Sequence, residues 1–403
     1  MKRIAVVGCG LRIVAFAKAL RETYCNTHKI VALMDTDPGK MAGFAKRTML
    51  EDVPQYTDFE LMCAEIKPDL LIIGTIDTFH AEYIVRALDK KIGVISEKPL
   101  CTTQEQCQAI REACRRNPEI FAVTSHNSRY RPVAQTLKKV LDSGVIGEIQ
   151  SVEYRELLDR IHGKSYFRRW NSRRKFSNGL QLHKSCHHFD RLNYLLNSYA
   201  VSVTADGSRT VYGHDAPHKF EGIRCHECTH KDECPDYFKF DDKLFQTELY
   251  TPDMCIYSPD IDIEDNFAAV IRFANGVLGT YSLCAHTQYE GEIINIEGET
   301  GRIEMRKVYY RKPGEVNSVH GDELVMDNSL KLFRFRTGTW VDVEVPKASG
   351  SHGGADDIMF SQIFAAEPPA DLPTLEDGMQ AVLTGVAAVE SIQLGKKVNV
   401  QLD

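Results

Sequence analysis

The first third of the chain alternates short apolar runs with segments whose apolar residues recur at helical spacing. The runs have the length of buried strands and occupy residues 4–7, 29–35, 70–73, 92–95 and 120–123. Helical periodicity fills several of the intervals, at 12–22, 80–88 and 103–116. Such alternation builds a parallel sheet covered by helices, with ligands bound beyond the carboxyl ends of its strands. We expect an α/β domain over residues 1–125.

The alternation stops after this point. A helical pattern at 132–143 is followed by strand-like runs joined mostly by short turns, at 149–154, 200–205, 266–273, 279–283, 292–297 and 301–305. Strands in direct succession indicate an antiparallel sheet. A second helical pattern covers 377–394 and is expected to pack on the first domain or at an interface. Residues 126–403 are therefore predicted to form an α+β domain, with an insertion of little periodicity at about 211–262.

Composition limits the classes of protein that remain. The 403 residues are 43% hydrophobic and 26% charged, as in soluble proteins of about two domains. A net charge of -7 without a long basic run argues against nucleic acid as a partner, and no apolar run is long enough to span a membrane. A strand is under way by Ile4, without the longer apolar stretch and small-residue cleavage site of a secretory signal, so we expect none. We expect a cytoplasmic protein whose 12 cysteines are mostly reduced thiols or metal ligands.

A glycine turn follows the first strand. Gly8 and Gly10 lie between that strand and a helix, and Asp35 ends the next strand. This order predicts a dinucleotide site, in which the backbone approaches the pyrophosphate and the carboxylate binds the ribose hydroxyls. Asp35 would repel a 2'-phosphate and therefore favours NAD over NADP. Arg12 leaves NADP possible as the cofactor, because a guanidinium near that ribose could pair with the 2'-phosphate.

Two further segments carry groups suited to acid–base chemistry. Lys98 stands in Glu97-Lys98-Pro99 after the fourth strand, where an ammonium group can stabilise an oxygen on which charge develops, although a surface lysine in a turn is the commoner case. The segment 180–196 is predicted as one helix, with His183, His187 and Asp190 on the arc opposite its apolar residues. That polar face would line a cleft or simply face solvent.

With these motifs in place, the chain resembles the Gfo/Idh/MocA family of nicotinamide-dependent sugar oxidoreductases along nearly its whole length. The matching motifs are Gly8-Cys9-Gly10, Thr75 with His80, Glu97-Lys98-Pro99, Asn127-Ser128-Arg129-Tyr130 and the segment from His183 to Asp190. The resemblance implies a Rossmann domain, a second domain with an open, mostly antiparallel sheet, and an active site between them. It also implies a homodimer or homotetramer, because the sheet face often forms an oligomer interface in this family.

The resemblance assigns roles to residues of this chain. Lys98 matches the substrate-orienting lysine, and His187 matches the histidine that acts as general acid and base. His183 stands where many members have an aspartate, which leaves open whether it tunes His187, binds substrate or does both. The expected cofactor-binding residues are Gly8, Gly10, Leu11, Arg12, Asp35, Thr75, His80, Glu97 and Lys98.

A basic, aromatic stretch precedes the histidine segment. It contains Arg168, Arg169 and Trp170, and has no acid between Tyr166 and Lys175. Such groups suit a carbohydrate that carries a carboxylate or another anionic group, whereas a solvated loop or an oligomer contact would account for them equally well. The predicted substrate-binding residues are Arg129, Tyr130, Arg168, Arg169, Trp170 and His188.

The insertion carries a cysteine cluster. Cys225 and Cys228 have the spacing of a zinc knuckle, and Cys234 and Cys255 could complete a closed, structural site. An iron–sulfur cluster is the rival interpretation, because Cys234-Pro235 resembles some cluster-binding runs, and buried free thiols are the third. His226 or His230 could replace Cys255 as a ligand.

Three functions are compatible with these features. The main hypothesis is an NAD-dependent oxidoreductase acting on a sugar, a polyol or a derivative, in which His187 takes the hydroxyl proton and Lys98 holds the same oxygen. The second is a glycosidase that retains NAD and works by transient oxidation and elimination. The third is a sensor of nicotinamide or sugar without catalysis, against which Lys98, His183 and His187 argue.

Overall fold

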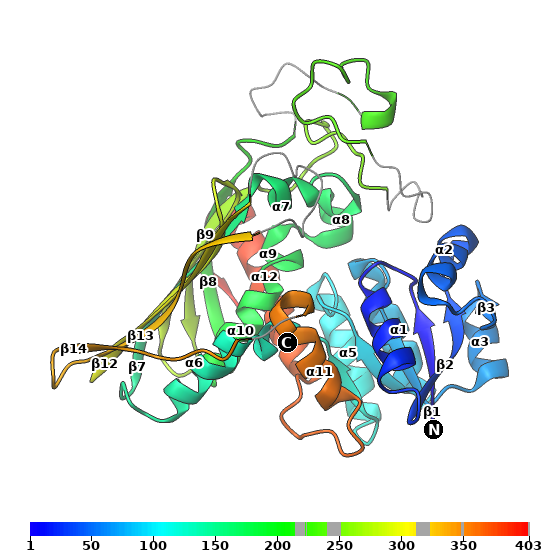
Figure 1. Ribbon diagram of the computed structural model, residues 1–403, viewed down its shortest axis with the longest axis horizontal. Helices are drawn as coiled ribbons and strands as arrows, with labels where there is room; N and C mark the ends of the chain where they lie inside the picture. The colour runs from blue at the N-terminus through cyan, green and yellow to red at the C-terminus, as the bar shows by residue number, and fades with distance from the viewer. Residues whose placement is uncertain (214–221, 223, 240–250, 312–322, 348–349, 402–403) are drawn as a thin grey trace.

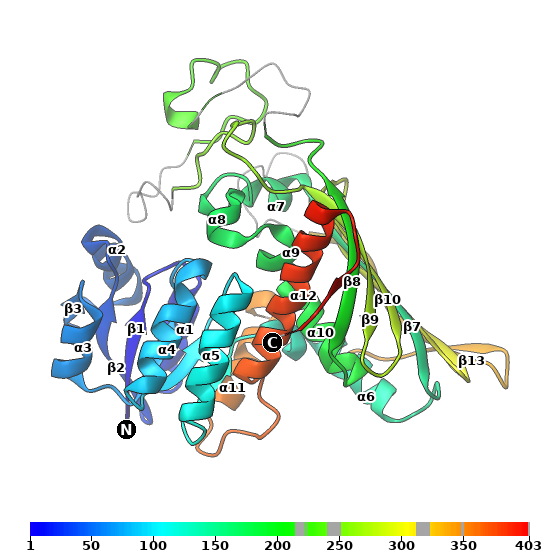
Figure 2. The same ribbon diagram turned by 180° about the vertical axis from the view of Figure 1, so that it is seen from behind.

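Two sheets, each with its own helices, organise the chain (Figure 1). The computed structural model describes residues 1–213, 222, 224–239, 251–311, 323–347 and 350–401. The N-terminal sheet and its helices lie beside the second, larger sheet, with helices between them (Figure 2). The predicted α/β domain followed by an α+β domain with a mostly antiparallel sheet is confirmed.

The first sheet is entirely parallel, with strand order β3-β2-β1-β4-β5-β6. Its strands are β1 (Lys2–Val7), β2 (His28–Met34), β3 (Gln55–Tyr56), β4 (Leu70–Ile73), β5 (Gly93–Ser96) and β6 (Ala122–Thr124). The order reverses between β1 and β4, so the loops that follow these two strands flank a crevice at the carboxyl edge. Ligand binding is expected at that edge.

Five α-helices belong to this sheet. They are α1 (Ile13–Glu22), α2 (Pro38–Thr48), α3 (Phe59–Ile66), α4 (His80–Asp89) and α5 (Gln104–Arg116). The sequence pattern located α1, α4 and α5. It did not locate α2 and α3, which begin at the side-chain caps of Asp37 and Asp58.

The second sheet has nine strands in the order β14-β13-β12-β11-β7-β10-β9-β8-β15. They are β7 (Ile149–Asp159), β8 (Ala200–Ser208), β9 (Asn266–Phe273), β10 (Leu278–Thr287), β11 (Glu290–Gly298), β12 (Gly301–Arg311), β13 (Glu323–Arg334), β14 (Thr339–Asp342) and β15 (Val398–Asn399). Among the described strands of this sheet, only β7 and β10 pair in parallel. Side chains along β9 are alternately buried and accessible, so one face is packed and the other is open.

Helices cover the packed face of this sheet. They include α6 (Pro132–Asp142), α7 (Arg160–Ser165), α8 (Arg174–Ser177), α9 (Leu180–His183), α10 (Cys186–Leu196) and α12 (Leu375–Leu394). The sequence pattern predicted a single helix over 180–196. This prediction is wrong, because Lys184 and Ser185 separate α9 from α10. The carbonyl oxygen of Leu180 accepts hydrogen bonds from both the backbone N–H and the hydroxyl of Ser185, each at 3.0 Å, which interrupts the regular helical pattern at this point.

The C-terminal helices join the two sheets. In α11 (Ala355–Ile363), the Asp356 carboxylate accepts two hydrogen bonds from the Arg12 guanidinium, at 2.7 and 2.8 Å. Helix α12 packs on α5 of the first domain and on β8 of the second. The expectation that the apolar C-terminal helix contacts the first domain is confirmed, and the two domains meet through buried contacts.

The cysteine-bearing insertion extends beyond the helices α7 and α8 (Figure 1). Residues 214–221, 223 and 240–250 of it lie outside the described residues. Among the helices of the described ranges, none combines the length and the apolar character that crossing a bilayer requires.

Candidate active site

A cavity of about 830 Å³ opens at the carboxyl edge of the first sheet and is closed on the far side by the second sheet. The first domain supplies its wall from the loops after β4 and β5, and β7 and β11 supply the opposite wall. Its polar lining includes Arg12, Thr75, Asp77, His80, Glu97, Lys98, Arg131, Glu156, His162, Tyr166, Arg169, Trp170, His183, Lys184, His187, Glu290 and Glu292. Such a concave site with convergent polar groups is where small ligands bind.

The glycine turn after β1 forms the cradle for a dinucleotide. Gly8 has φ +90°, and a Cβ at this position would lie 2.5 Å from the backbone nitrogen of Thr75. Only glycine avoids both the strain and the clash, so the turn brings the chain unusually close to the loop after β4. Helix α1 begins directly beyond it, so the positive end of its dipole can stabilise the charge of a pyrophosphate. The residues present therefore fit the cofactor.

Asp35 follows β2, as a ribose-binding acid should, and it is buried. Its carboxylate accepts a hydrogen bond from the Cys9 backbone N–H at 2.8 Å and pairs with Lys40 at 2.9 Å. Arg12, considered as a partner for a 2'-phosphate, lies elsewhere, because Glu97 and Asp356 hold its guanidinium. The cation beside the ribose position is Lys40, which the sequence analysis did not include.

Lys98 reaches the cavity from the loop after β5. Its ammonium group donates to the His183 carbonyl oxygen at 3.1 Å, so it links the first domain to α9. His80 braces the same loop, because its imidazole nitrogens lie 2.8 Å from the Pro99 carbonyl oxygen and 3.2 Å from that of Thr75. His80 is thus a support for the loop that carries Lys98.

His187 lies at the start of α10 and lines the cavity. Its Nδ1 is buried and has no hydrogen-bond partner among the described residues, which leaves Nε2 as the nitrogen open to the cavity. Burial, the positive charge of Lys98 and the neighbouring His126 all lower the pKa of His187 well below the usual imidazole value. At neutral pH the imidazole is uncharged and can accept a proton.

His183 forms a dyad with an acid from the first domain. Its Nδ1 lies 2.5 Å from Oδ2 of the buried Asp77, in the loop after β4. Burial lowers the pKa of His183, Asp77 opposes that shift, and Lys98 and Arg169 add to it. With Nδ1–H donated to Asp77, the tautomer leaves Nε2 as an acceptor. The cavity therefore holds two separate imidazole bases.

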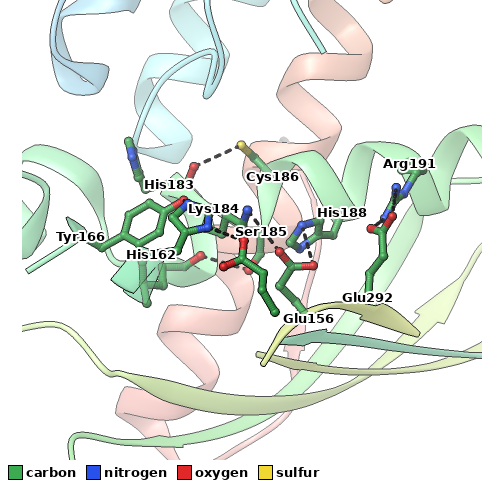
Figure 3. A network of polar contacts seen from close by, with 12 residues as sticks. Glu156, His162, Tyr166, His183, Lys184, Ser185, Cys186, His188, Arg191 and Glu292 are labelled. Carbon is green, nitrogen blue, oxygen red and sulfur yellow. Dashed lines mark hydrogen bonds and ion pairs between the residues drawn. The ribbon is translucent and has the colours of Figure 1, made fainter. Parts of the chain in front are cut away.

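A network of buried charges lies on the side of the second sheet (Figure 3). Glu156 of β7 lies between Lys184, at 3.1 Å, and His188, at 3.4 Å. Burial raises the pKa of Glu156, although Lys184 opposes the shift. Farther along, the Glu292 carboxylate pairs with Arg191 and accepts a hydrogen bond from the Tyr154 hydroxyl at 2.9 Å. This network fixes the wall opposite the dinucleotide turn.

Four residues predicted to bind substrate lie outside the cavity lining. Arg129 is buried and donates two hydrogen bonds, at 2.6 and 2.7 Å, to Asp190. Asp190 was expected to line a cleft or face solvent, but it is buried against Arg129. Tyr130 packs in the apolar core. Arg168 donates to the Asp236 carbonyl oxygen, and His188 bonds the hydroxyl of Tyr281. The polar groups of Arg129, Arg168 and His188 are engaged by the protein itself.

Nine of the other predicted residues are brought together, whereas Gly8, Gly10, Leu11 and Asp35 are not part of this lining. Arg12, Thr75, His80, Glu97, Lys98, Arg169, Trp170, His183 and His187 all line the cavity. Asp77, Glu156 and His162 also line the cavity but were not predicted, because each pairs with a residue distant in sequence. Nor was His126, a fully buried residue whose ring lies 6.1 Å from that of His187. Asp77 could have been found as an acid directly after the third long apolar strand.

The cysteine cluster gives no support to zinc or to an iron–sulfur cluster. All twelve cysteines are free thiols. Cys225 accepts a hydrogen bond from Arg168 at 3.6 Å, and His226, considered as a ligand, is paired with Asp253. Within the described part of the chain, no group of three or more histidine, cysteine, aspartate or glutamate side chains is arranged to hold a metal ion.

Comparison with known proteins agrees with this geometry. Residues 2–125 match the family model described as "Oxidoreductase family, NAD-binding Rossmann fold". Residues 138–400 match the one described as "Oxidoreductase family, C-terminal alpha/beta domain". The chain is thus an oxidoreductase with an NAD-binding domain, and it belongs to the Gfo/Idh/MocA family.

Individual relatives extend the match over most of the chain. YteT of Bacillus subtilis is 32% identical over 414 residues, covering 96% of this chain and 94% of that protein. D-Glucoside 3-dehydrogenase of Escherichia coli is 27% identical over 157 residues, 38% of this chain and 43% of that protein. The structure of a levoglucosan dehydrogenase in complex with NADH shares the fold, with a TM-score of 0.70, 18% identity and coverage of 100% of both chains.

Proposed function

We propose that the protein catalyses NAD-dependent oxidation of a hydroxyl group on a sugar, a polyol or a derivative. The observation that supports this most is the meeting of Lys98 and His187 in one cavity beside the glycine turn. The dehydrogenases among the relatives, one of them named for D-glucosides, support the same class of substrate. Asp35 at the end of β2 favours NAD over NADP, and Lys40, which pairs with it, is the cation that could bind a 2'-phosphate instead.

The residues divide the work between them. When bound, NAD accepts the hydride from the carbon that bears the hydroxyl. His187 accepts the hydroxyl proton at Nε2, because its lowered pKa keeps the ring uncharged at neutral pH. The Lys98 ammonium group, held at the His183 carbonyl, donates to the substrate oxygen as negative charge develops on it. Asp77 fixes the His183 ring beside them.

Replacing Lys98 with methionine tests this assignment. Loss of the ammonium group should lower kcat for hydroxyl oxidation by about 100- to 1000-fold, because an oriented donor to the developing charge is removed. NAD affinity, measured by calorimetry, should be nearly unchanged. Lys91→Met is the matched control, since Lys91 precedes the same strand and pairs with Glu119 at the surface. Full activity of Lys98→Met would remove Lys98 from the mechanism.

A second candidate function is favoured by the two separate imidazole bases. A glycosidase that oxidises a hydroxyl, eliminates the aglycone, adds water and returns the hydride needs one base for the hydroxyl and another for the neighbouring carbon. His187 and the Asp77–His183 dyad could fill those roles. Release of 4-nitrophenol from aryl glycosides without accumulation of NADH would identify this reaction.

We also propose that the protein forms a homodimer or homotetramer through the open sheet face. A groove crosses this face and is lined by residues of β7, β8, β9 and β10. Val270 is 45% exposed there. Val270→Glu should lower the molar mass measured by light scattering, whereas Leu61→Glu on the exposed side of α3 should not. A wild-type mass equal to that of one chain would contradict the proposal.

A further inference from the structure

Arg169 differs from the other arginines that line the cavity. Arg12 is held by Glu97 and Asp356, and Arg131 lies 3.4 Å from Glu292. Arg169 has no ion pair or side-chain hydrogen bond with any residue in the described part of the chain, and its Nε is buried without a partner. Buried guanidinium nitrogens without a partner also occur at Arg173, Arg174 and Arg191, so what sets Arg169 apart is that it lines the cavity and has no acidic partner in the described residues. A guanidinium in that position can bind an anionic ligand.

The surroundings of Arg169 suit a sugar ring. Tyr166 and Trp170 flank it in the sequence and also line the cavity. Their rings lie 5.8 and 5.3 Å from the His183 ring, each with an edge-to-face arrangement. Arg169 is also close enough to His183 to lower the pKa of that histidine. The guanidinium therefore belongs to the same chamber as the two imidazoles.

We propose that Arg169 binds a carboxylate on the substrate, so that the protein acts on sugar acids such as uronates or their glycosides. This inference rests on the proposed function, because it names the substrate class for the same cavity. A planar guanidinium matches a planar carboxylate through two parallel hydrogen bonds. A phosphate is the other anion that a guanidinium binds, and the titration with glucose 6-phosphate below distinguishes the two.

Direct binding tests this inference independently of turnover. D-Glucose, D-glucuronate and glucose 6-phosphate are titrated into the protein with NADH present, and binding is followed by NADH fluorescence. D-Glucuronate should bind at least about tenfold more tightly than D-glucose. Arg169→Gln should lower the affinity for D-glucuronate by about 10- to 100-fold and leave that for D-glucose unchanged. Arg169→Lys should recover part of the affinity for D-glucuronate, because the positive charge remains although the two parallel donors of the guanidinium are lost.

Arg173→Gln is the matched control, since Arg173 pairs with Asp260 and does not line the cavity. Equal losses for both sugars in Arg169→Gln, tighter binding of glucose 6-phosphate, or a loss of NADH affinity in place of uronate affinity would each overturn the inference. Oxidation of D-glucose with no preference for the acid would leave the proposed function intact and remove this inference. Binding of D-glucuronate through Arg169 without any NADH formation from NAD would leave this inference intact and count against the proposed function.

Discussion

Replacing His187 with asparagine should lower kcat for hydroxyl oxidation by about 10²- to 10⁴-fold, the usual contribution of a positioned acid–base group. Asparagine keeps a polar side chain at the start of α10 but cannot take a proton from the substrate. NAD affinity and the unfolding transition should change little. Initial rates of NADH formation measure the first effect, and unaltered rates would exclude His187 as the base.

The pH dependence sharpens this test. Burial and Lys98 lower the pKa of His187, and the uncharged ring is the reactive form for oxidation. Activity should therefore be present above that pKa and be lost as the pH falls through it, at a pH lower than the ordinary imidazole value of about 6.5. Removing the charge in Lys98→Met should raise the pKa of His187, which NMR titration of the ring can follow. An unshifted pKa would show that Lys98 does not act on His187.

Replacing Glu292 with glutamine should destabilise the protein by about 3–5 kcal/mol, because Arg191 would keep a buried charge without its partner. The two side chains are 3% and 1% exposed. Burial alone would raise the pKa of Glu292, but Arg191 and Arg131 outweigh it and hold the pKa well below its usual value. The stabilisation is therefore present above about pH 4.5 and is lost as the pH falls through the folded-state pKa.

Glu297→Gln provides the control on the same strand. Glu297 also pairs with an arginine, Arg302, but the side chains are 44% and 32% exposed. An exposed pair of this kind contributes at most about 1 kcal/mol. Urea denaturation measures the free energy of unfolding of both variants, which lose the same kind of ion pair at a buried and at an exposed position. Equal losses of stability would show that the buried network does not stabilise the fold more than a surface pair does.

The elements that could be predicted from the sequence are those whose burial is nearly complete. β1 and β4 read as continuous apolar runs because helices cover both faces of the parallel sheet. The break between α9 and α10 could not be predicted, because it depends on how the backbone N–H and the hydroxyl of Ser185 both bond the carbonyl oxygen of Leu180. Asp190 faces Arg129 and not the cavity, through a contact between residues distant in sequence.

The candidate site was predictable where a motif places a group at a strand end. Lys98 and Thr75 follow strands of the parallel sheet and reach the cavity for that reason. Arg129 and Arg169 show the limit of prediction from sequence, because both are arginines beside aromatic residues and look alike there. Asp190 lies 61 positions from Arg129 and neutralises it, whereas Arg169 has no such partner in the described residues. Only tertiary structure distinguishes a structural arginine from one prepared for a ligand.

The most direct test of the proposed oxidation records NADH absorbance and aglycone release together for the wild-type protein. NAD is added with neutral sugars, sugar acids, inositols and aryl glycosides in turn. NADH that accumulates with a free sugar, sugar acid or polyol, and does not accumulate with the His187→Asn variant, is the predicted result. Aglycone release without lasting NADH, or binding of NAD with neither product, would contradict an oxidoreductase that releases its reduced cofactor.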